Sequence, residues 1–182
     1  MKQKLIILDR DGVINEDSDA YIKSPDELIP IPGSLAAIAQ LNGAGYSVAV
    51  ATNQSGIARG YFDMNTLQSI HDKLNQLLEK QGGHIDVIVF CPHGPEDNCD
   101  CRKPKSGMLS SILAKFAVPV ENTVSVGDSL RDLQAAAALG IKSLLVRTGK
   151  GKKTEAELAN HPTLFGTPVF NSLSDAVDDL LK

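Results

Sequence analysis

Residues 4–12 read KLIILDRDG, an unbroken apolar run followed at once by two aspartates and a glycine. A run this continuously apolar is typical of a strand buried on both faces, as in a parallel sheet. In an open parallel sheet the ligand crevice lies at the carboxyl ends of the strands, which is where Asp9 and Asp11 follow. Side-chain alternation aims both carboxylates the same way, and Gly12 permits a sharp turn. The segment therefore predicts a buried first strand that ends in a polar site.

Along the rest of the chain, short β-branched runs alternate with amphipathic stretches, the pattern of a doubly wound, Rossmann-like α/β fold with a parallel sheet. The expected strands are residues 4–8, 47–51, 87–90, 123–126 and 142–146. The expected helices are residues 34–42, 65–80, 108–116, 130–139 and 173–181, with a short one near 154–160. Neither a repeat nor a long linker divides the sequence. We therefore expect residues 1–182 to form a single domain.

The composition excludes several classes of protein. Of the 182 residues, 42% are hydrophobic and 22% are charged, which is ordinary for a globular chain and unlike disorder, collagen or a coiled coil. The 22 acidic and 18 basic residues give a net charge of −4, which offers no broad basic field for nucleic acid. No apolar run approaches the roughly 18 residues that span a bilayer, and aspartates come too early for a signal peptide. We expect a cytoplasmic protein, monomeric by default, with no nucleic-acid or membrane partner.

Three further polar segments follow predicted strands or precede predicted helices. Residues 52–56 (TNQSG) offer hydroxyls, an amide and backbone N–H groups suited to phosphate oxygens, although a plain polar turn has the same composition. Residues 102–105 (RKPK) gather basic groups before a helix, as a solvated charge run also does. Residues 126–129 (VGDS) place Asp128 directly after a strand, where an aspartate is also a common helix cap.

The pair Asp9 and Asp11 also has an electrostatic consequence. Two carboxylates this close need a cation or a shared proton. Mg²⁺, which prefers oxygen ligands, would supply the cation. A loop capped by two aspartates, without a metal, is the alternative interpretation.

The periodicity stops at residues 91–107, CPHGPEDNCDCRKPKSG, a loop long enough to be functional or disordered. All three cysteines of the chain and one histidine form the pattern CxHx5CxC: Cys91, His93, Cys99 and Cys101. Three thiols and an imidazole are the ligand set of a closed, structural Zn²⁺ site, with no position left open for catalysis. A redox pair of the last two cysteines, or a cluster of buried thiols, stays open as an alternative. Zinc would fix the loop and place Arg102 and Lys103, the next two residues, beside a bound phosphate.

The order and placement of these segments resemble those of the haloacid-dehalogenase-like phosphatases over nearly the whole chain. The resemblance implies that Asp9 attacks phosphorus and forms an aspartyl phosphate, while Asp11 protonates the leaving alkoxide and later deprotonates water. Thr52 and Lys103 would hold the phosphoryl oxygens, and Asp132 would orient its neighbours. The resemblance also implies three magnesium ligands: the carboxylates of Asp9 and Asp128 and the backbone carbonyl of Asp11.

Within this family, the zinc loop resembles two groups, the D-glycero-D-manno-heptose 1,7-bisphosphate 7-phosphatases and the histidinol-phosphate phosphatases. Residues 51–62 (ATNQSGIARGYF) resemble the first group closely, and residues 12–31 and 57–64 leave room for only a minimal cap. The first group implies release of the 7-phosphate from a small sugar bisphosphate. The second implies the same chemistry on a cationic amine, which Glu16, Asp17 and Asp19 could attract.

The resemblance implies short loops as the source of specificity. The implied substrate-binding residues are Asp17, Tyr21, Thr52, Asn53, Gln54, Ser55, Arg102 and Lys103. Two departures from the family pattern are residues 16–21 (EDSDAY), which match only with an inserted residue, and Ser129, where some members carry lysine. The other histidines show no ligand pattern and are expected to be surface or helix residues: His71, His84 and His161. A non-enzymatic zinc module ranks last, because 4% aromatic residues offer no stacking platform for nucleic acid.

Overall fold

Six parallel strands form one sheet in the computed structural model, which describes residues 3–182. The strands are β1 (Lys4–Leu8), β2 (Tyr46–Asn53), β3 (Val87–Cys91), β4 (Thr123–Gly127), β5 (Lys142–Val146) and β6 (Val169–Phe170). Their order is β3-β2-β1-β4-β5-β6, so the chain winds outward from β1 to one edge and then from β4 to the other. The predicted doubly wound parallel sheet is confirmed.

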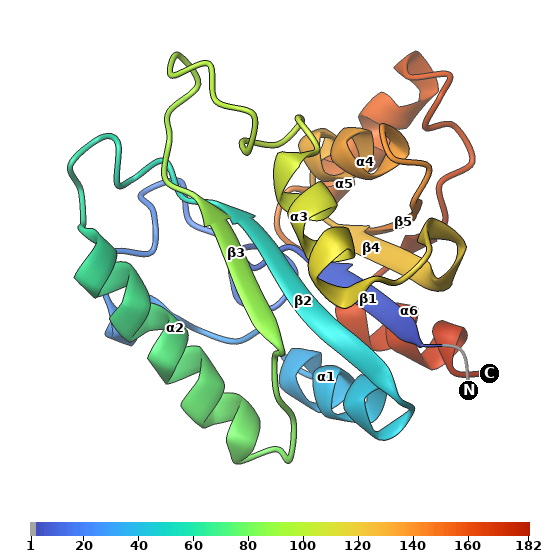
Figure 1. Ribbon diagram of the computed structural model, residues 1–182, viewed down its shortest axis with the longest axis horizontal. Helices are drawn as coiled ribbons and strands as arrows, with labels where there is room; N and C mark the ends of the chain where they lie inside the picture. Colours follow the sequence, from blue (N-terminus) through green and yellow to red (C-terminus); the bar gives the residue numbers. More distant parts are fainter. Residues whose placement is uncertain (1–2) are drawn as a thin grey trace.

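Two helix layers cover the faces of the sheet. The helices are α1 (Ser34–Gly43), α2 (Met64–Glu79), α3 (Gly107–Phe116), α4 (Leu130–Ala137), α5 (Gly151–Glu157) and α6 (Leu173–Leu180). In Figure 1, α3 and α4 lie in front of the sheet, and α1 and α6 lie behind it. One core cluster joins α1, α2 and α6 to the sheet, and a second joins α3 and α4 to its other face.

The first strand shows why an unbroken apolar run suits this fold. Ile6 and Leu8 pack into the cluster with α1, α2 and α6, whereas Leu5 and Ile7 pack into the cluster with α3 and α4. All four side chains are at most 1% exposed. Burying one such side chain contributes roughly 1.5–3 kcal/mol relative to leaving it in water. The central strand is therefore held rigidly from both faces.

Helix boundaries follow capping residues. Asp63 precedes α2 and accepts a hydrogen bond from the Thr66 backbone N–H at 2.8 Å. Ser129 and Asp132 form a capping box at the start of α4, so that each satisfies a backbone N–H of the other. These bonds satisfy donors that the first helical turn leaves unpaired.

The structure differs from the prediction in the last third of the chain and at one strand end. The expected helix near residues 154–160 begins earlier, as α5 from Gly151, and continues as a 3-10 turn at Leu158–Asn160. The strand β6 was not predicted, because two residues between turns show no alternation. Strand β2 runs on to Asn53, so Thr52 lies on the strand instead of in a turn after it.

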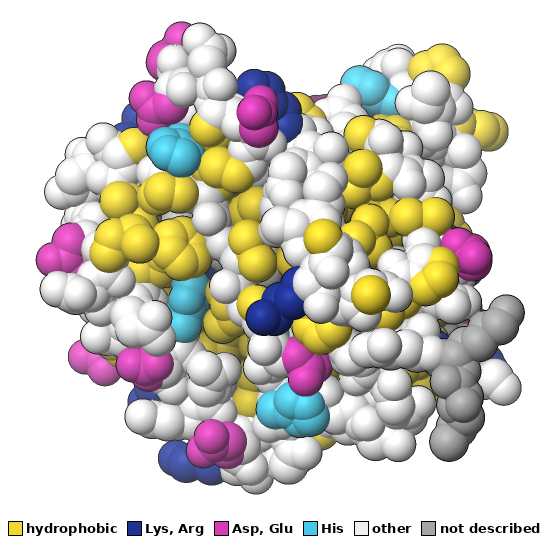
Figure 2. Space-filling model, viewed as in Figure 1, with side chains coloured by type: hydrophobic (Ala, Val, Ile, Leu, Met, Phe, Trp, Pro, Cys, Tyr) yellow, Lys and Arg dark blue, Asp and Glu magenta, His cyan; other side chains and the backbone are white. Residues whose placement is uncertain are grey.

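The loop between β3 and α3 rises above the carboxyl ends of the strands (Figure 1). On the face shown in Figure 2, the coloured Lys and Arg side chains are scattered singly among Asp and Glu and form no basic stripe. Within residues 3–182, no helix is both long enough and apolar enough to cross a bilayer.

Candidate active site

A cavity of about 350 Å³ opens where the carboxyl ends of β1, β2 and β4 meet the β3–α3 loop. Its lining includes all the catalytic and substrate residues expected from the sequence, and the expected magnesium ligand Asp128. They are Asp9, Asp11, Asp17, Tyr21, Thr52, Asn53, Gln54, Ser55, Arg102, Lys103 and Asp128. Side chains that are up to 119 residues apart in the chain are thus gathered at one sheet edge, as the positions of the strand ends predict.

Lys103 is the central cation of this cavity. Its Nζ lies 3.1 Å from Asp9 Oδ1 and 2.6 Å from Asp132 Oδ1, with its side chain only 4% exposed. It also donates to the Ala51 backbone carbonyl at 2.6 Å. Burial opposes the charge, but the two carboxylates outweigh it and raise the pKa of Lys103 above its ordinary value. Lys103 is therefore a fixed, permanently charged donor beside Asp9.

Three carboxylates, those of Asp9, Asp128 and Asp132, bring an oxygen each within 4.8 Å of one another. Burial and then the charge of Asp132 raise the pKa of Asp9 to about 7. Burial and then the charge of Asp9 raise the pKa of Asp128 to about 8. Both shifts reflect burial first and then a repulsion between carboxylates that Lys103 alone does not relieve. A divalent cation with oxygen ligands would relieve it, so the donor set fits Mg²⁺.

Two glycines make room for the Asp128 carboxylate. A Cβ on Gly12 or on Gly149 would collide with Asp128 Oδ2, and both glycines have a positive φ. The same oxygen accepts a hydrogen bond from the Lys150 backbone N–H at 2.7 Å. The glycine after the aspartate pair thus permits a turn and also admits the carboxylate from β4 to the site.

Asp132 is held differently from the other two carboxylates. Its Oδ1 is paired with Lys103, and its Oδ2 accepts from the backbone N–H and the hydroxyl of Ser129 at 3.0 and 2.7 Å. Both oxygens are therefore engaged by the protein. This geometry suits the orienting role expected of Asp132, and leaves Asp9 and Asp128 as the freer pair.

Asp11 is fixed by a dense set of donors. Arg10 donates from Nε to Oδ1 at 3.1 Å and from Nη2 at 2.9 Å, and Asn15 Nδ2 donates to the same oxygen at 2.9 Å. Gln54 Nε2 reaches Oδ2 at 2.9 Å. Although burial raises it, Arg10 and these hydrogen bonds lower the pKa of Asp11 overall. The carboxylate therefore has one fixed orientation at the cavity wall.

The polar residues that end β2 connect the parts of the site. The Gln54 amide donates to Thr52 Oγ1 at 3.0 Å as well as to Asp11. Asn53 donates to the Lys103 carbonyl and accepts from the Lys103 backbone N–H, both at 3.0 Å. Asn53 thus ties the segment that carries Lys103 to the sheet.

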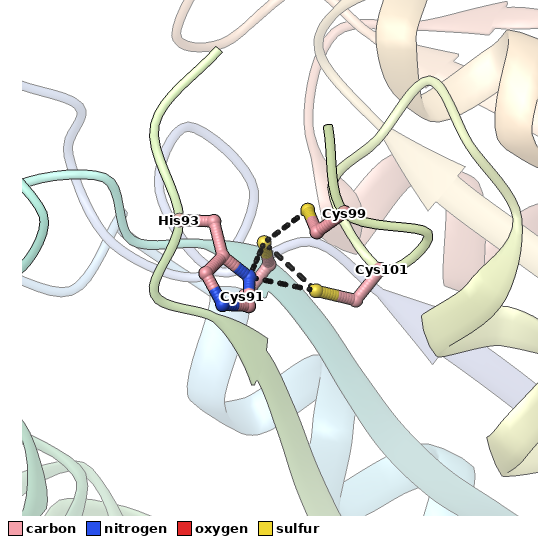
Figure 3. Close-up of side chains that lie close together, drawn as sticks. All are labelled: Cys91, His93, Cys99 and Cys101. Atoms are coloured by element: carbon pink, nitrogen blue, oxygen red, sulfur yellow. Dashed lines mark hydrogen bonds between the residues drawn. The ribbon is translucent and has the colours of Figure 1, made fainter. Parts of the chain in front are cut away.

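The four candidate zinc ligands converge, as Figure 3 shows. Cys91 and His93 come from the end of β3 and the residues just after it, and the other two from the returning limb of the loop. Cys91 Sγ lies 3.6 Å from His93 Nδ1 and 3.7 Å from Cys99 Sγ, and His93 Nδ1 lies 3.3 Å from Cys101 Sγ. Tetrahedral zinc holds its nitrogen and sulfur ligands roughly 3.5–3.8 Å apart. Cys101 Sγ lies only 3.1 Å from Cys91 Sγ, so the four side chains suit the ion in type and arrangement but would have to spread slightly around it. The three cysteines form no disulfide.

Hydrogen bonds link this cluster to neighbouring cations. Arg102 Nη1 donates to the His93 carbonyl at 3.2 Å, and Lys105 Nζ donates to the Cys99 carbonyl at 2.6 Å. A change in the shape of the cluster would therefore move Arg102, which lines the cavity.

Sequence reasoning missed three cations that line the cavity, namely Arg59, Arg131 and Lys150. Arg102 and Arg131 line the same cavity, and burial and then the charge of Arg131 lower the pKa of Arg102. Lys150 Nζ pairs with Asp17 at 3.2 Å. The sequence did hold a signal that two of them lie near the site. Arg131 is in the first turn of the helix after β4, and Lys150 follows the carboxyl end of β5.

The histidines outside the zinc cluster are placed mostly as expected. His84 is exposed, and His161 follows the 3-10 turn that ends at Asn160. His71 lies on α2, as a helix residue, but it is only 4% exposed and contacts Arg10, a contact that the sequence did not predict. No local pattern in the sequence reveals a contact across 61 positions.

Comparison with known proteins agrees with this geometry. Residues 100–176 match the HAD-hydrolase-like family. Proteins of Pseudomonas aeruginosa and Bordetella bronchiseptica, both named D-glycero-beta-D-manno-heptose-1,7-bisphosphate 7-phosphatase, are 52% and 54% identical to the chain. The alignments cover 100% of both chains for the first and 98% of both for the second.

Solved structures show the same relationship. The B. bronchiseptica D,D-heptose 1,7-bisphosphate phosphatase, solved with magnesium and phosphate, superposes with a TM-score of 0.93 at 54% identity over 98% of each chain. The Burkholderia thailandensis enzyme has a TM-score of 0.77 at 47% identity over 99% of each chain. The chain therefore belongs to the HAD-like hydrolases, in the branch formed by the heptose bisphosphate phosphatases.

Proposed function

We propose that the protein is a phosphatase that removes the 7-phosphate of D-glycero-β-D-manno-heptose 1,7-bisphosphate and leaves the 1-phosphate in place. The single observation that carries the substrate is the similarity over the whole length to enzymes named for this reaction, at 52–54% identity. Their names specify the β anomer, which the sequence alone did not distinguish from the α anomer. The reaction makes the protein a phosphoric monoester hydrolase.

The chain's own residues supply the chemistry. Asp9 attacks phosphorus and becomes an aspartyl phosphate. Asp11 must first take up a proton because, despite burial, Arg10 lowers its pKa in the free protein, and it then gives that proton to the departing sugar oxygen. Water then attacks the phosphorus of the aspartyl phosphate, Asp11 takes up the proton of that water, and the bond between phosphorus and Asp9 breaks to release phosphate and the free Asp9 carboxylate. Lys103, at 3.1 Å from Asp9, and Thr52 hold phosphoryl oxygens as charge redistributes among them.

The proposal includes two bound metal ions, Mg²⁺ and Zn²⁺. Mg²⁺ would be held by the carboxylates of Asp9 and Asp128 and by the backbone carbonyl of Asp11. When bound, it supplies the positive charge that lets an anionic nucleophile approach an anionic phosphoryl group. Gly12 and Gly149, where a Cβ would collide with Asp128, leave room for this carboxylate, and the raised pKa values of Asp9 and Asp128 support the assignment. Zn²⁺ would be held by the cysteine and histidine cluster as a structural ion.

The charges at the mouth of the cavity favour a second phosphate over an amine. Four cations besides Lys103 line it: Arg59, Arg102, Arg131 and Lys150. Asp17, one of the carboxylates that could attract the amine of histidinol phosphate, is already paired with Lys150. Arg102 and Arg131 line the same cavity and are suited to bind the doubly charged 1-phosphate.

The remaining features of the proposal concern the whole protein. One continuous sheet joins both halves of the chain, which supports a single phosphatase domain. Free cysteines persist in a reducing compartment, which supports a cytoplasmic location. The monomeric state remains a prediction from the sequence.

The proposed function is tested by phosphate release from a panel of substrates with Mg²⁺ present. The panel holds both anomers of heptose 1,7-bisphosphate, histidinol phosphate and hexose monophosphates. We expect the highest kcat/KM for the β anomer, and phosphorus NMR should show that the 1-phosphate remains on the sugar. Faster hydrolysis of histidinol phosphate, or loss of the 1-phosphate, would contradict the proposal.

A further inference from the structure

Arg10 lies between Asp9 and Asp11 in the sequence, yet its side chain turns away from the cavity and is completely buried at 0% exposure. It does not line the cavity. Its guanidinium donates from Nε and Nη2 to Asp11, with the shortest contact at 2.9 Å. A fully buried arginine is rare unless its charge is paired, and here the partner is the proposed proton donor.

The third nitrogen of the guanidinium has a partner from a distant helix. Arg10 Nη1 lies 3.2 Å from Nε2 of His71, which is on α2 and 4% exposed. Arginine can only donate, so the imidazole Nε2 must accept, and the ring proton must be on Nδ1. Burial and then the charge of Arg10 lower the pKa of His71 to about 4. The imidazole is therefore neutral, as acceptance requires.

We propose that His71 and Arg10 are positioning residues that hold Asp11 in the orientation needed for proton transfer. His71 fixes the plane of the guanidinium, and the guanidinium presents its Nε and Nη2 fork to Asp11. Asn15 and Gln54 complete the set of donors to the same carboxylate. The inference rests on the proposed function, in which Asp11 exchanges the proton of the leaving group.

The orientation matters because proton transfer depends steeply on geometry. Two hydrogen bonds from a planar fork fix a carboxylate in position and in rotation, which one donor alone cannot do. Without His71, Arg10 Nη1 would be a buried donor with no acceptor, and the guanidinium would turn to find one. The Nε and Nη2 groups of Arg10 would then no longer hold the Asp11 carboxylate, which could rotate away from the leaving oxygen.

A positioning role differs from a purely structural one in its dependence on the leaving group. An alkoxide such as the sugar oxygen needs a proton as it departs, whereas p-nitrophenolate leaves without one. The quantity kcat/KM reports binding and every step up to the departure of the leaving group, so the comparison of its values for the two substrates isolates the protonation by Asp11. Loss of positioning should therefore reduce kcat/KM for the sugar phosphate and spare it for p-nitrophenyl phosphate.

The experiment compares His71→Leu with His71→Gln in the zinc-loaded and magnesium-loaded enzyme, using heptose 1,7-bisphosphate and p-nitrophenyl phosphate. Leucine keeps an apolar volume without an acceptor, whereas the glutamine Oε1 can accept from Arg10. We expect His71→Leu to lower kcat/KM about tenfold on the sugar and less than about twofold on the aryl phosphate, since a well-placed acid contributes about 10²–10⁴-fold in all. His71→Gln should restore most of the loss.

Two further variants keep the test decisive. Arg10→Lys retains the charge but removes the fork, and should show the same selective loss on the sugar phosphate. Leu78→Val removes volume from the same buried face of α2 without changing any polar contact, and should leave the ratio of the two substrates unchanged. Circular dichroism and thermal unfolding establish that each variant is folded.

Equal losses on both substrates in His71→Leu, or a His71→Gln variant as impaired as His71→Leu, would overturn the positioning role. If the wild-type protein released no phosphate from heptose 1,7-bisphosphate, the proposed function would fail on its own. The positioning role would still be decided by the ratio between any alkyl phosphate that the enzyme hydrolyses and p-nitrophenyl phosphate.

Discussion

The two candidate metal sites are linked through the segment 101–103, but the protein holds them in different ways. The carboxylates of Asp9 and Asp128 follow strands β1 and β4, which are buried between two helix layers. The zinc cluster lies on a long loop, where only Cys91 belongs to a strand. The first site is therefore positioned by the hydrophobic core, whereas the second is positioned by the contacts of its own four ligands.

This difference indicates what each metal does. At the carboxylate site the strands already hold the ligands in place, and what a bound ion would add is positive charge between the carboxylates. At the candidate zinc site the four ligands are present, but the loop that carries them has no hydrophobic core of its own. A bound ion would stabilise the conformation of that loop. We therefore expect removal of magnesium to stop chemistry without changing the fold, and removal of zinc to change the fold of one loop.

The largest effect on activity should come from Asp9→Asn, which removes the nucleophile and leaves both the sheet and the β3–α3 loop in place. We expect kcat to fall by at least about a thousandfold, as for the loss of the nucleophile in other enzymes. Zinc content and circular dichroism should not change. A turnover near that of the wild type would show that Asp9 is not the nucleophile.

The second effect concerns magnesium and pH. The pKa values of Asp9 and Asp128 are raised to about 7 and about 8 in the folded, metal-free protein, against 3.8 for the ordinary side chain. Between pH 4 and pH 8 the folded state therefore keeps protons that the unfolded chain has released, so its stability falls as the pH rises. Magnesium replaces those protons, and its stabilising effect should grow over the same range.

Thermal unfolding at pH 5 and pH 8, with and without Mg²⁺, measures this effect. At a Mg²⁺ concentration about one hundred times Kd we expect about 2.7 kcal/mol at pH 8, or about 5–10 °C in Tm, and less than half of that at pH 5. Asp128→Asn should lose most of the shift and its pH dependence. A larger shift at pH 5 than at pH 8 would show that these carboxylates do not bind the ion.

Removal of zinc should have a smaller effect on catalysis and a larger effect on local structure. In Cys101→Ser, or after chelation, we expect rapid hydrogen exchange across residues 91–105 and a fall in kcat/KM of about tenfold to a hundredfold. Mg²⁺ affinity should stay within about twofold, because the carboxylates depend on strands. Asp9→Asn, which keeps the loop, is the control for hydrogen exchange alone. Unchanged exchange in a zinc-free protein would show that the loop folds without the metal.

The smallest effect should come from the cavity mouth. Arg131→Ala should raise KM for heptose 1,7-bisphosphate about threefold to tenfold with little change in kcat, because a partly exposed contact to phosphate contributes only about 1 kcal/mol. Hexose monophosphates, which lack the second phosphate, should show no change. Lys142→Ala, an exposed lysine at the opposite end of β5, is the control. An equal loss on monophosphates would remove Arg131 from the second-phosphate site.

The parts of the fold and site that the sequence predicts are those with a local signal. A buried parallel strand is a continuous apolar run, and a site residue directly after it is placed by the topology, as with Asp9 and Asp128. The candidate zinc ligands lie within eleven residues, so their spacing in the sequence is enough to predict the cluster. Strand β6 has only two residues and gives no periodic signal.

Other features depend on contacts between distant segments. The pairing of Arg10 with His71 joins a strand end to a helix 61 positions away, and nothing in either neighbourhood marks it. Arg131 and Lys150 follow strand ends in the sequence, but that both line one cavity depends on how α4 and the segment before α5 pack above the sheet. Such contacts follow from packing, which a periodic pattern does not specify.

The central claim, that Asp9 receives the phosphoryl group beside a magnesium ion, is tested most directly by a crystal structure with Mg²⁺ and beryllium fluoride, a mimic of the bound phosphoryl group. We predict beryllium bonded to an Asp9 carboxylate oxygen, its fluorines contacting Thr52 and Lys103, and Mg²⁺ bound by Asp9 and Asp128. Beryllium fluoride bonded to another side chain, or Mg²⁺ bound away from Asp128, would contradict the account.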